Sequence, residues 1–277
     1  MDVGIVGAGT MGIGIAHALI SSGSNAYLVE PQAGQLEIAT AGIEAVLASG
    51  VSRGKLSELE MTAAVKRLRT ASDIGDLPTG LDWIIEAVTE SPEVKARVLR
   101  KAEDRKPLRL ASNTSALSIT RLAESLSHPE SFLGTHFFNP VWSMKLLEIV
   151  VGSLTSPQTV SDAEVLGRVL HKETIVVKDS PGFASSRLGV LLGIEAIRML
   201  QDGIASAEDI DKAMVYGYGY PMGPLRLGDL VGLDVRLSVA QSLAEAYGDR
   251  FAPPQLLIDM VGANKLGKKT GEGFYRW

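Results

Sequence analysis

The chain has 277 residues and a formal net charge of −5, with 45% apolar and 21% charged residues. This mixture is typical of a globular protein with one large domain or two ordinary ones. The acidic balance disfavours nucleic acid and anionic membrane surfaces as partners. The absence of cysteine excludes a disulfide scaffold, a thiolate metal site and a cysteine nucleophile. No uninterrupted apolar run reaches the ~18 residues of a membrane span, and we expect a cytoplasmic protein.

The amino-terminal two-thirds of the chain alternate short apolar runs with helical patterns. In chain order, these patterns predict a strand at 3–6, a helix at 12–22, a strand at 25–30, a helix at 35–49, a strand at 81–87, a helix at 92–101, a strand at 108–112, a helix at 118–126, and strands at 132–138 and 146–150. Strands that alternate with helices indicate an α/β fold with a doubly wound, mostly parallel sheet of the Rossmann type.

The pattern changes after residues 175–178. Pro181 and Gly182 predict a turn, and nearly everything beyond them has helical spacing. Helices are expected at 183–201, after the capping residue Ser206, at 225–247 with interruptions at Gly228 and Gly232, and at 254–261. The sequence therefore predicts a dinucleotide-binding domain at residues 1–180 and an all-helical domain at residues 181–277.

Three glycines follow the first predicted strand with the spacing G-x-G-x-x-G. Gly7 permits a tight turn, Gly9 lets the backbone approach a pyrophosphate, and Gly12 lets the helix pack close to the strand. The helix amino-terminus adds free N–H groups and partial positive charge. Glu30 ends the second strand, where a carboxylate accepts hydrogen bonds from the adenosine ribose and favours NAD over NADP. The alternative is a structural turn with an unrelated surface glutamate.

Two polar residues in apolar surroundings are candidates for proton transfer. His136 stands beside two phenylalanines, and taken alone it is more typical of a packed core histidine. Glu148 lies inside an apolar strand pattern, where a carboxylate is costly to bury unless it is paired. A histidine on a neighbouring strand is the obvious partner, and such a pair suits catalysis. The four histidines show no metal-ligand spacing, so no metal site is expected.

Taken together, several runs make the chain resemble the L-3-hydroxyacyl-CoA dehydrogenase family over essentially its whole length. The family includes bacterial 3-hydroxybutyryl-CoA dehydrogenases. The runs that carry the resemblance are GAGTMGIGIA at 7–16, IIEAVTE at 84–90, SNTSALSIT at 112–120, HFFNPVWSMKLLEIV at 136–150, DSPGF at 179–183, YPMGPLRLGDLVGLD at 220–234 and LGKKTGEGFY at 266–275. The most diagnostic run is HFFNP with a glutamate after it.

The resemblance implies NAD-dependent, reversible oxidation of an L-3-hydroxyacyl-CoA to the 3-ketoacyl-CoA. It makes His136 the catalytic base, Glu148 the carboxylate that orients it, and Ser115 a hydroxyl near the substrate oxygen and the nicotinamide. Arg53 stands where the family binds the phosphates of CoA, and Lys55 is its neighbour. A homodimer formed by the helical domain is also implied. The implied NAD contacts are Gly7, Gly9, Thr10, Met11, Gly12, Glu30, Glu90, Lys95, Ser115 and Asn139.

One position departs from the family pattern. The family has Asn-Arg after the PGF run, whereas Ser186 precedes Arg187 here. A serine is shorter than asparagine and has one donor proton, so it would hold the substrate oxygen through a water, or the contact would be lost. This departure leaves open a dehydrogenase of a CoA-free 3-hydroxy acid. An alternative of another class is a catalytically idle NAD-binding protein on the same fold. The sequence does not indicate the acyl chain length.

Overall fold

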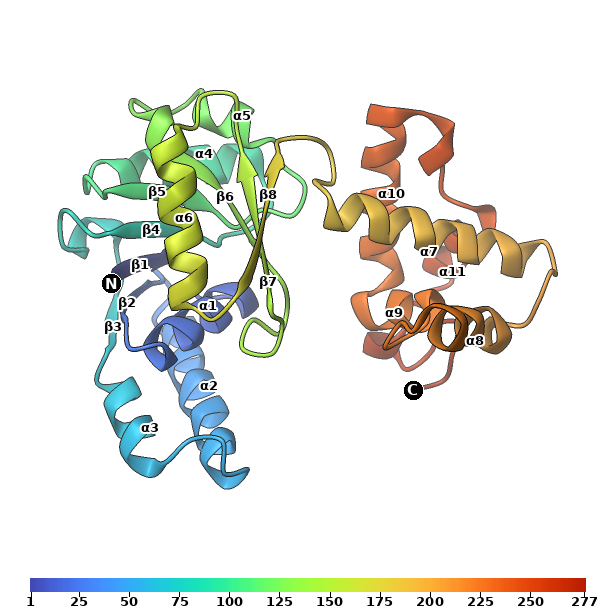
Figure 1. Cartoon of the computed structure of the whole chain (residues 1–277), viewed down its shortest axis with the longest axis horizontal. Coiled ribbons are helices and arrows are strands. Elements are labelled where there is room, and N and C mark those ends of the chain that lie inside the picture. Colours follow the sequence, from blue (N-terminus) through green and yellow to red (C-terminus); the bar gives the residue numbers. More distant parts are fainter. The chain divides into compact units, whose positions relative to one another are not determined.

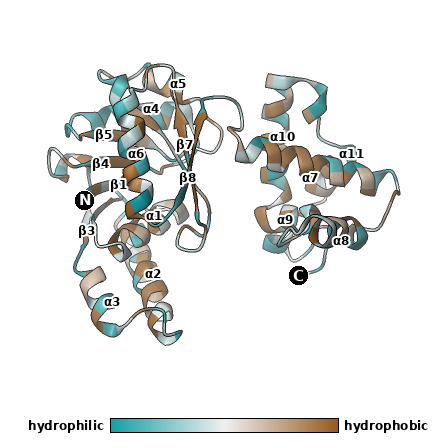
Figure 2. Ribbon diagram, in the orientation of Figure 1, coloured by the Kyte–Doolittle hydropathy of each residue, from teal (hydrophilic) through white to brown (hydrophobic).

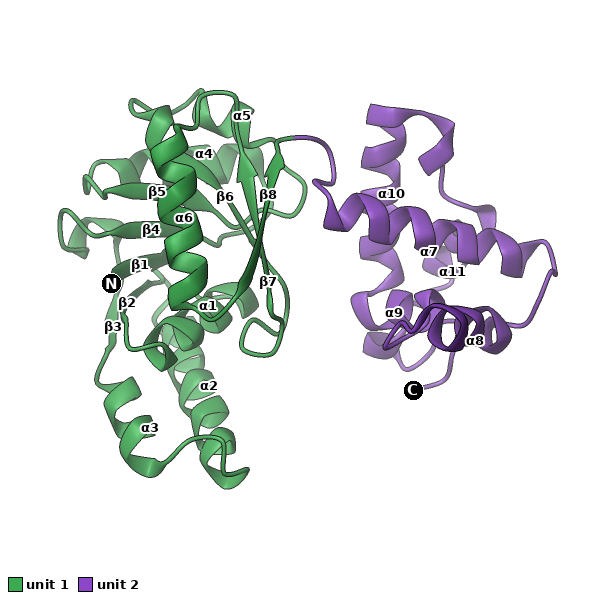
Figure 3. Cartoon of the chain, in the orientation of Figure 1, with its two compact units in different colours: residues 1–179 green, residues 180–277 purple.

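A sheet of eight strands forms the first of two units into which the chain divides, Met1–Asp179 and Ser180–Trp277 (Figures 1 and 3). The computed structural model describes all 277 residues. The strands are β1 (Asp2–Val6), β2 (Asn25–Val29), β3 (Leu68–Ala71), β4 (Trp83–Glu86), β5 (Arg109–Ser112), β6 (Phe132–Phe137), β7 (Leu146–Val151) and β8 (Glu173–Lys178). Their order is β3-β2-β1-β4-β5-β6-β7-β8, and only β6 and β7 pair antiparallel. The predicted doubly wound, mostly parallel sheet is confirmed.

Apolar strands explain why this sheet forms a core. A parallel sheet covered on both faces needs nearly continuous apolar strands, and four of the five residues of β1 are buried. Figure 2 shows the same concentration of apolar residues along the inner strands. Ile15 of α1 and Ile43 of α2 belong to this core. The helices of the unit are α1 (Thr10–Ser21), α2 (Ala33–Ser52), α3 (Glu58–Val65), α4 (Pro92–Glu103), α5 (Ile119–Ala123) and α6 (Pro157–Val169).

Four elements of the first unit were not predicted, namely α3, β3, α6 and β8. Strand β3 has four residues, none of them fully buried, so it has no apolar run that a sequence pattern could detect. Helix α3 did have a local signal, because Ser57 and Glu60 form a reciprocal capping box at its start. Capping boxes satisfy two backbone donors and mark helix starts in sequence. The helix buries only Ala64, so it has no apolar face that would add to the capping signal.

The second unit contains only helices, which confirms the predicted all-helical segment. Ser206 caps α8 by accepting a hydrogen bond from the backbone N–H of Asp209 at 3.1 Å. The expected interruption at Gly228 is wrong, because Gly228 lies inside α9 and a single break at Gly232, with φ of +104°, separates α9 from α10. None of the helices in either unit is both long and apolar enough to cross a membrane. The helices of this unit are α7 (Ser185–Gln201), α8 (Ala207–Tyr218), α9 (Pro224–Val231), α10 (Leu233–Tyr247) and α11 (Gln255–Gly262).

Candidate active site

The candidate site lies at one edge of the sheet. Strands β2, β1, β4, β5 and β6 are mutually parallel, so their carboxyl ends meet along this edge, where ligands of open α/β sheets bind. The residues predicted from sequence follow or end these strands. They are Gly7 after β1, Glu30 after β2, Glu90 after β4, Ser115 after β5, His136 in β6 and Asn139 just beyond β6.

The turn between β1 and α1 depends on its three glycines. Gly7 has φ of +107°, which favours glycine, and a Cβ there would lie 2.7 Å from the carbonyl oxygen of Ala87. A Cβ on Gly12 would lie 1.8 Å from the carbonyl oxygen of Gly7, so helix α1 approaches the turn only because residue 12 is glycine. Gly9 caps α1, and no protein atom lies within 4 Å of its Cβ position. The turn thus leaves open backbone at Gly9, which fits a pyrophosphate.

The carboxylate of Glu30 reaches the same turn. Its Oε2 accepts a hydrogen bond from the backbone N–H of Ala8 at 3.1 Å, and its Oε1 accepts one from the N–H of Gln32 at 3.2 Å. Thr10 and Met11 are the first two residues of helix α1, which follows this turn. A negative charge held at this place suits ribose hydroxyls and repels a 2′-phosphate. The residues therefore fit NAD.

His136 and Glu148 face each other across strands β6 and β7. The two residues are directly opposed in the antiparallel register, so both side chains leave the same face of the sheet. Glu148 Oε2 lies 2.8 Å from His136 Nδ1, and the exposed fractions are 0% and 5%. The ring of Phe138 lies 4.5 Å from the imidazole, centroid to centroid. A buried carboxylate at Nδ1 fixes both the orientation and the tautomer of the imidazole.

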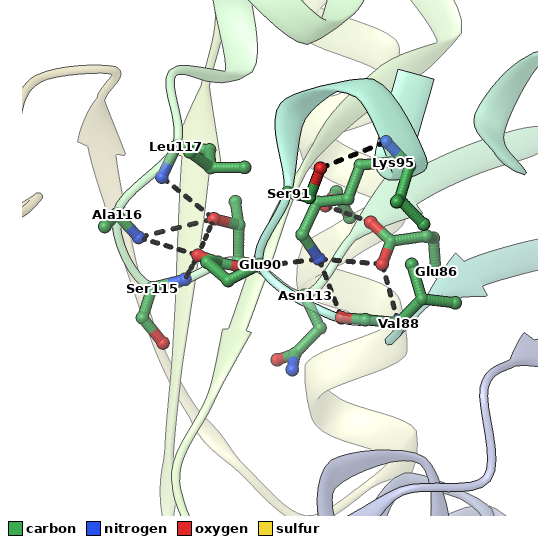
Figure 4. A network of polar contacts seen from close by, with 12 residues as sticks. Glu86, Val88, Glu90, Ser91, Lys95, Asn113, Ser115, Ala116 and Leu117 are labelled. Carbon is green, nitrogen blue, oxygen red and sulfur yellow. Dashed lines mark hydrogen bonds and ion pairs between the residues drawn. The ribbon is translucent and has the colours of Figure 1, made fainter. Parts of the chain in front are cut away.

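Ser115 lies on the loop after β5, and hydrogen bonds from this loop to Glu90 are drawn in Figure 4. Asn113 Oδ1 accepts a hydrogen bond from the backbone N–H of Phe137 at 3.0 Å, which ties the loop to the residue after His136. Glu90 Oε1 accepts hydrogen bonds from the N–H of Ser115 at 2.9 Å and from the Thr114 hydroxyl. The Ser115 side chain itself is exposed. The loop therefore presents a hydroxyl from a fixed backbone.

Sequence analysis missed Glu86, the last residue of β4. Glu86 and Lys95 are both fully buried, and Lys95 Nζ lies 2.7 Å from Glu86 Oε1. The signal was available, because a carboxylate that ends an apolar strand needs a buried partner for the same reason as Glu148 does. The ammonium of Lys95, which was expected to contact NAD, lies beside Glu86, Glu90 and the carbonyl oxygen of Val88.

A cavity of about 580 Å³ lies among α1, α2 and the loop after β6. Arg53 and Lys55, both exposed, line it together with Trp142 and His17. The indole of Trp142 is 45% exposed, and the ring of His17 meets it at an angle of 62°. Burial, and then the charge of Lys172, lower the pKa of His17, so its imidazole is neutral near pH 7. Two cations beside an exposed aromatic ring suit a phosphorylated ligand with a base.

Ser186 belongs to the second unit of the chain, whereas the residues described above belong to the first. It is the second residue of α7, half-buried in the first turn of that helix, and belongs to the second unit. The structure thus brings together the candidate catalytic and NAD-binding residues of the first unit along one sheet edge, places Arg53 and Lys55 in a separate cavity of that unit, and places the serine that departs from the family pattern on a helix of the other unit.

A dinucleotide-binding sheet edge that also holds a histidine against a buried carboxylate is suited to a dehydrogenase, because oxidation of an alcohol needs a proton acceptor beside a hydride acceptor. Comparison with known proteins agrees. Residues 2–180 match the family model described as "3-hydroxyacyl-CoA dehydrogenase, NAD binding domain", and residues 182–277 match the model of the C-terminal domain of the same family. The chain belongs to the 3-hydroxyacyl-CoA dehydrogenase family, and it is an NAD-dependent oxidoreductase of that type.

Individual relatives carry related names. A 3-hydroxybutyryl-CoA dehydrogenase of Clostridioides difficile is 38% identical over 99% of both chains. A 3-hydroxyadipyl-CoA dehydrogenase of Escherichia coli is also 38% identical, over 99% of this chain and 58% of that protein. The crystal structure of an (S)-3-hydroxybutyryl-CoA dehydrogenase from Ralstonia eutropha superimposes with a TM-score of 0.95, at 38% identity over 100% of this chain and 98% of that one. Relatives with the same sequence identity to this chain are named for different acyl groups, so sequence identity does not indicate which acyl chain this protein accepts.

Proposed function

We propose that the protein interconverts an L-3-hydroxyacyl-CoA and the 3-ketoacyl-CoA, with His136 as the group that exchanges the hydroxyl proton. The observation that carries this proposal is the 2.8 Å contact between Glu148 Oε2 and His136 Nδ1. Because Nδ1 faces the carboxylate, the proton passes at Nε2, and Glu148 stabilises the imidazolium that forms. NAD, when bound, accepts the hydride from the carbon that bears the hydroxyl. In the reverse direction the imidazolium returns the proton to the substrate oxygen.

Two serines are proposed to bind the reacting oxygen. Ser115 stands on the loop that Asn113 and Glu90 anchor, so its hydroxyl can donate to the oxygen with little rearrangement. Ser186 takes the position of the family asparagine and would donate a single hydrogen bond, directly or through a water. The proposed NAD contacts are Gly7, Gly9, Thr10, Met11, Gly12, Glu30, Glu90, Lys95, Ser115 and Asn139.

The glycine turn gives a prediction about NAD binding that separates affinity from folding. In Gly9→Ala the new methyl group meets no protein atom but occupies the space proposed for the pyrophosphate. We expect NADH affinity to fall roughly tenfold or more, which is ~1.4 kcal/mol, at an unchanged midpoint of thermal unfolding. NADH fluorescence titration and calorimetry measure the two quantities. Gly34→Ala, which also meets no atom, is the control, and equal NADH affinity in both variants would contradict the assignment.

The cavity lined by Arg53 and Lys55 is proposed to take the nucleotide end of CoA. We expect Arg53→Ala to raise KM for acetoacetyl-CoA about fivefold, since an exposed ion pair contributes up to ~1 kcal/mol. KM for acetoacetyl-pantetheine, which has no nucleotide, should not change. Arg121→Ala, an exposed arginine of α5, is the control. A similar rise in KM for both thioesters would place the nucleotide elsewhere.

The activity itself is tested by following NADH absorbance after acetoacetyl-CoA or free acetoacetate is added. NADH loss with the CoA ester alone supports the proposal. Turnover of the free acid would instead favour a CoA-independent 3-hydroxy acid dehydrogenase. If neither is consumed, the same assay with longer and aromatic 3-ketoacyl-CoA esters decides between another acyl group and an idle NAD-binding protein.

We further propose a homodimer formed by the second unit, in the cytoplasm. Large apolar side chains that stay exposed on its helices support the dimer, and the need for NAD and CoA esters, which are held inside cells, supports the location. Light scattering of the purified protein measures the oligomeric state. The exposed apolar residues are Leu188, Leu191, Tyr216, Leu227, Leu230, Val231 and Val235.

A further inference from the structure

Arg236 places a cation on the apolar face of helix α10. Residues three, four and seven positions apart share one face of a helix, and the neighbours of Arg236 at these distances are Leu233, Ala240 and Leu243, which are all buried. Helix α10 packs against α7 and α9 (Figure 1). Arg236 therefore stands at a position where the core of the second unit would ordinarily hold another apolar side chain.

The guanidinium of Arg236 has no counter-charge within the chain. Its Nε is enclosed and has no hydrogen-bond partner. Burial lowers the pKa of Arg236, and no carboxylate of the chain acts against this effect. An arginine stays charged in proteins all the same, and an unpaired charge in apolar surroundings is destabilising. Such a residue suits an anion that comes from outside the chain.

The guanidinium lies beside a bare stretch of α7. Its Nη1 is 3.6 Å from the position that a Cβ on Gly189 would occupy, so a longer side chain there would displace it. Gly193, one turn further, is buried and yet has no protein atom within 4 Å of its Cβ position. The cavity of about 10 Å³ that Gly193, Gly228 and Arg236 line has room for one water. A water can bond to Nε but cannot neutralise the charge, so the anion has to meet the part of the side chain that is still exposed.

Ser186 lies on the same face of α7 as this stretch. Residues 186, 189, 190 and 193 follow one another at helical spacing. A rise of ~1.5 Å per residue puts Gly189 about 4.5 Å and Gly193 roughly 10 Å from Ser186 along the helix axis. Because Ser186 is proposed to bind the reacting oxygen, an acyl chain that follows α7 from there reaches the guanidinium after a few carbon atoms.

We propose that Arg236 binds a carboxylate at the far end of the acyl group, so that the protein prefers 3-hydroxyacyl-CoA substrates derived from dicarboxylic acids. The proposal rests on the dehydrogenase function and on the role of Ser186 proposed above. A guanidinium binds a carboxylate through two parallel hydrogen bonds. An acyl group that ends in a methyl group would leave the cation unpaired, so the site discriminates against it.

The experiment compares two ligands that differ only in this end group. Adipyl-CoA and hexanoyl-CoA have the same chain length and lack the oxygen on the third carbon, so calorimetry measures their binding without turnover. We expect the wild type to bind adipyl-CoA about 30-fold more tightly, which is ~2 kcal/mol and in the range of hydrogen bonds to charged groups.

Arg236→Met should abolish this preference and bind hexanoyl-CoA as the wild type does. Because the substitution removes an unpaired buried charge, the midpoint of thermal unfolding should not fall. Arg276→Met, which changes an exposed arginine of the same unit, is the control and should keep the preference. The kcat/KM values for NADH-dependent reduction of 3-oxoadipyl-CoA and 3-oxohexanoyl-CoA should follow the same order as the affinities.

Equal affinity of the wild type for the two ligands overturns the proposal without any variant. A preference that persists in Arg236→Met also overturns it, and so does an equal loss of affinity for both ligands, since Arg236 would then act on packing alone. If Arg236→Met turns a dimer into a monomer and keeps the preference, a carboxylate of a second copy is the counter-ion and the proposal is wrong. A preference that depends on Arg236, in a protein that reduces neither 3-oxo ester, supports the carboxylate site and refutes the dehydrogenase function instead.

Discussion

His136→Gln should lower kcat by about 10³-fold, within the range that a positioned proton-transfer group contributes, while NADH binds as in the wild type. Glutamine approximates the size of imidazole and can hydrogen-bond to Glu148, but it cannot take up a proton at neutral pH. The imidazole lies on β6 and the glycine turn follows β1, so the cofactor contacts stay in place. Steady-state turnover of 3-hydroxybutyryl-CoA, with NADH fluorescence titration of the same sample, measures both effects.

The control for this variant is His128→Gln. The side chain of His128 is 72% exposed and belongs to the same unit, so its loss should leave kcat unchanged. Near-normal turnover by His136→Gln would remove His136 from the mechanism. A matching loss of NADH affinity would instead indicate that the substitution disturbs the sheet edge as a whole.

The glycine turn was predictable because its requirements are local. A side chain at Gly7 or Gly12 would clash with backbone atoms of the turn itself or of the adjacent loop. The glycine spacing in the sequence therefore indicates the turn directly. The same holds for Ser206, whose capping of α8 involves a residue three positions later. Helix α3 has an equally local capping box and was still not predicted, and strand β3 has neither a cap nor an apolar run.

The His136–Glu148 pair was predictable for another reason. The residues are twelve positions apart, and no local pattern links them, but a carboxylate in an apolar strand requires a partner. The same argument applies to Glu86, whose partner Lys95 lies on the helix that follows β4. The predicted strand 81–87 places Glu86 inside an apolar run, so the same signal is present there. Only the structure shows that this strand end is fully buried.

The family resemblance transfers contacts from residue type and position, whereas the structure shows the surroundings of each side chain. The ammonium of Lys95 lies beside Glu86, Glu90 and the carbonyl oxygen of Val88, which no sequence pattern predicts. Arg53 is exposed and lines a cavity, so the contact implied by the resemblance is physically available there.

Glu148→Gln should lower kcat by about 10²-fold, less than His136→Gln, and move the pH profile of the oxidation to lower pH. The amide keeps the shape of the carboxylate but removes its negative charge, so the imidazolium that forms during oxidation loses its counter-charge. The amide of the glutamine can also donate a hydrogen bond to Nδ1 of His136. This favours the tautomer that carries its proton on Nε2, and a protonated Nε2 cannot accept the hydroxyl proton of the substrate.

The readouts for Glu148→Gln are kcat as a function of pH and the midpoint of thermal unfolding. A residue needed only for packing would lower the unfolding midpoint and leave the pH profile in place. Removal of a fully buried charge also removes its desolvation cost, so we expect stability to change little while the profile moves. Glu130→Gln, an exposed glutamate just before β6, is the matched control. An unshifted profile together with a lower unfolding midpoint would reduce Glu148 to a structural residue and leave His136 without its proposed counter-charge.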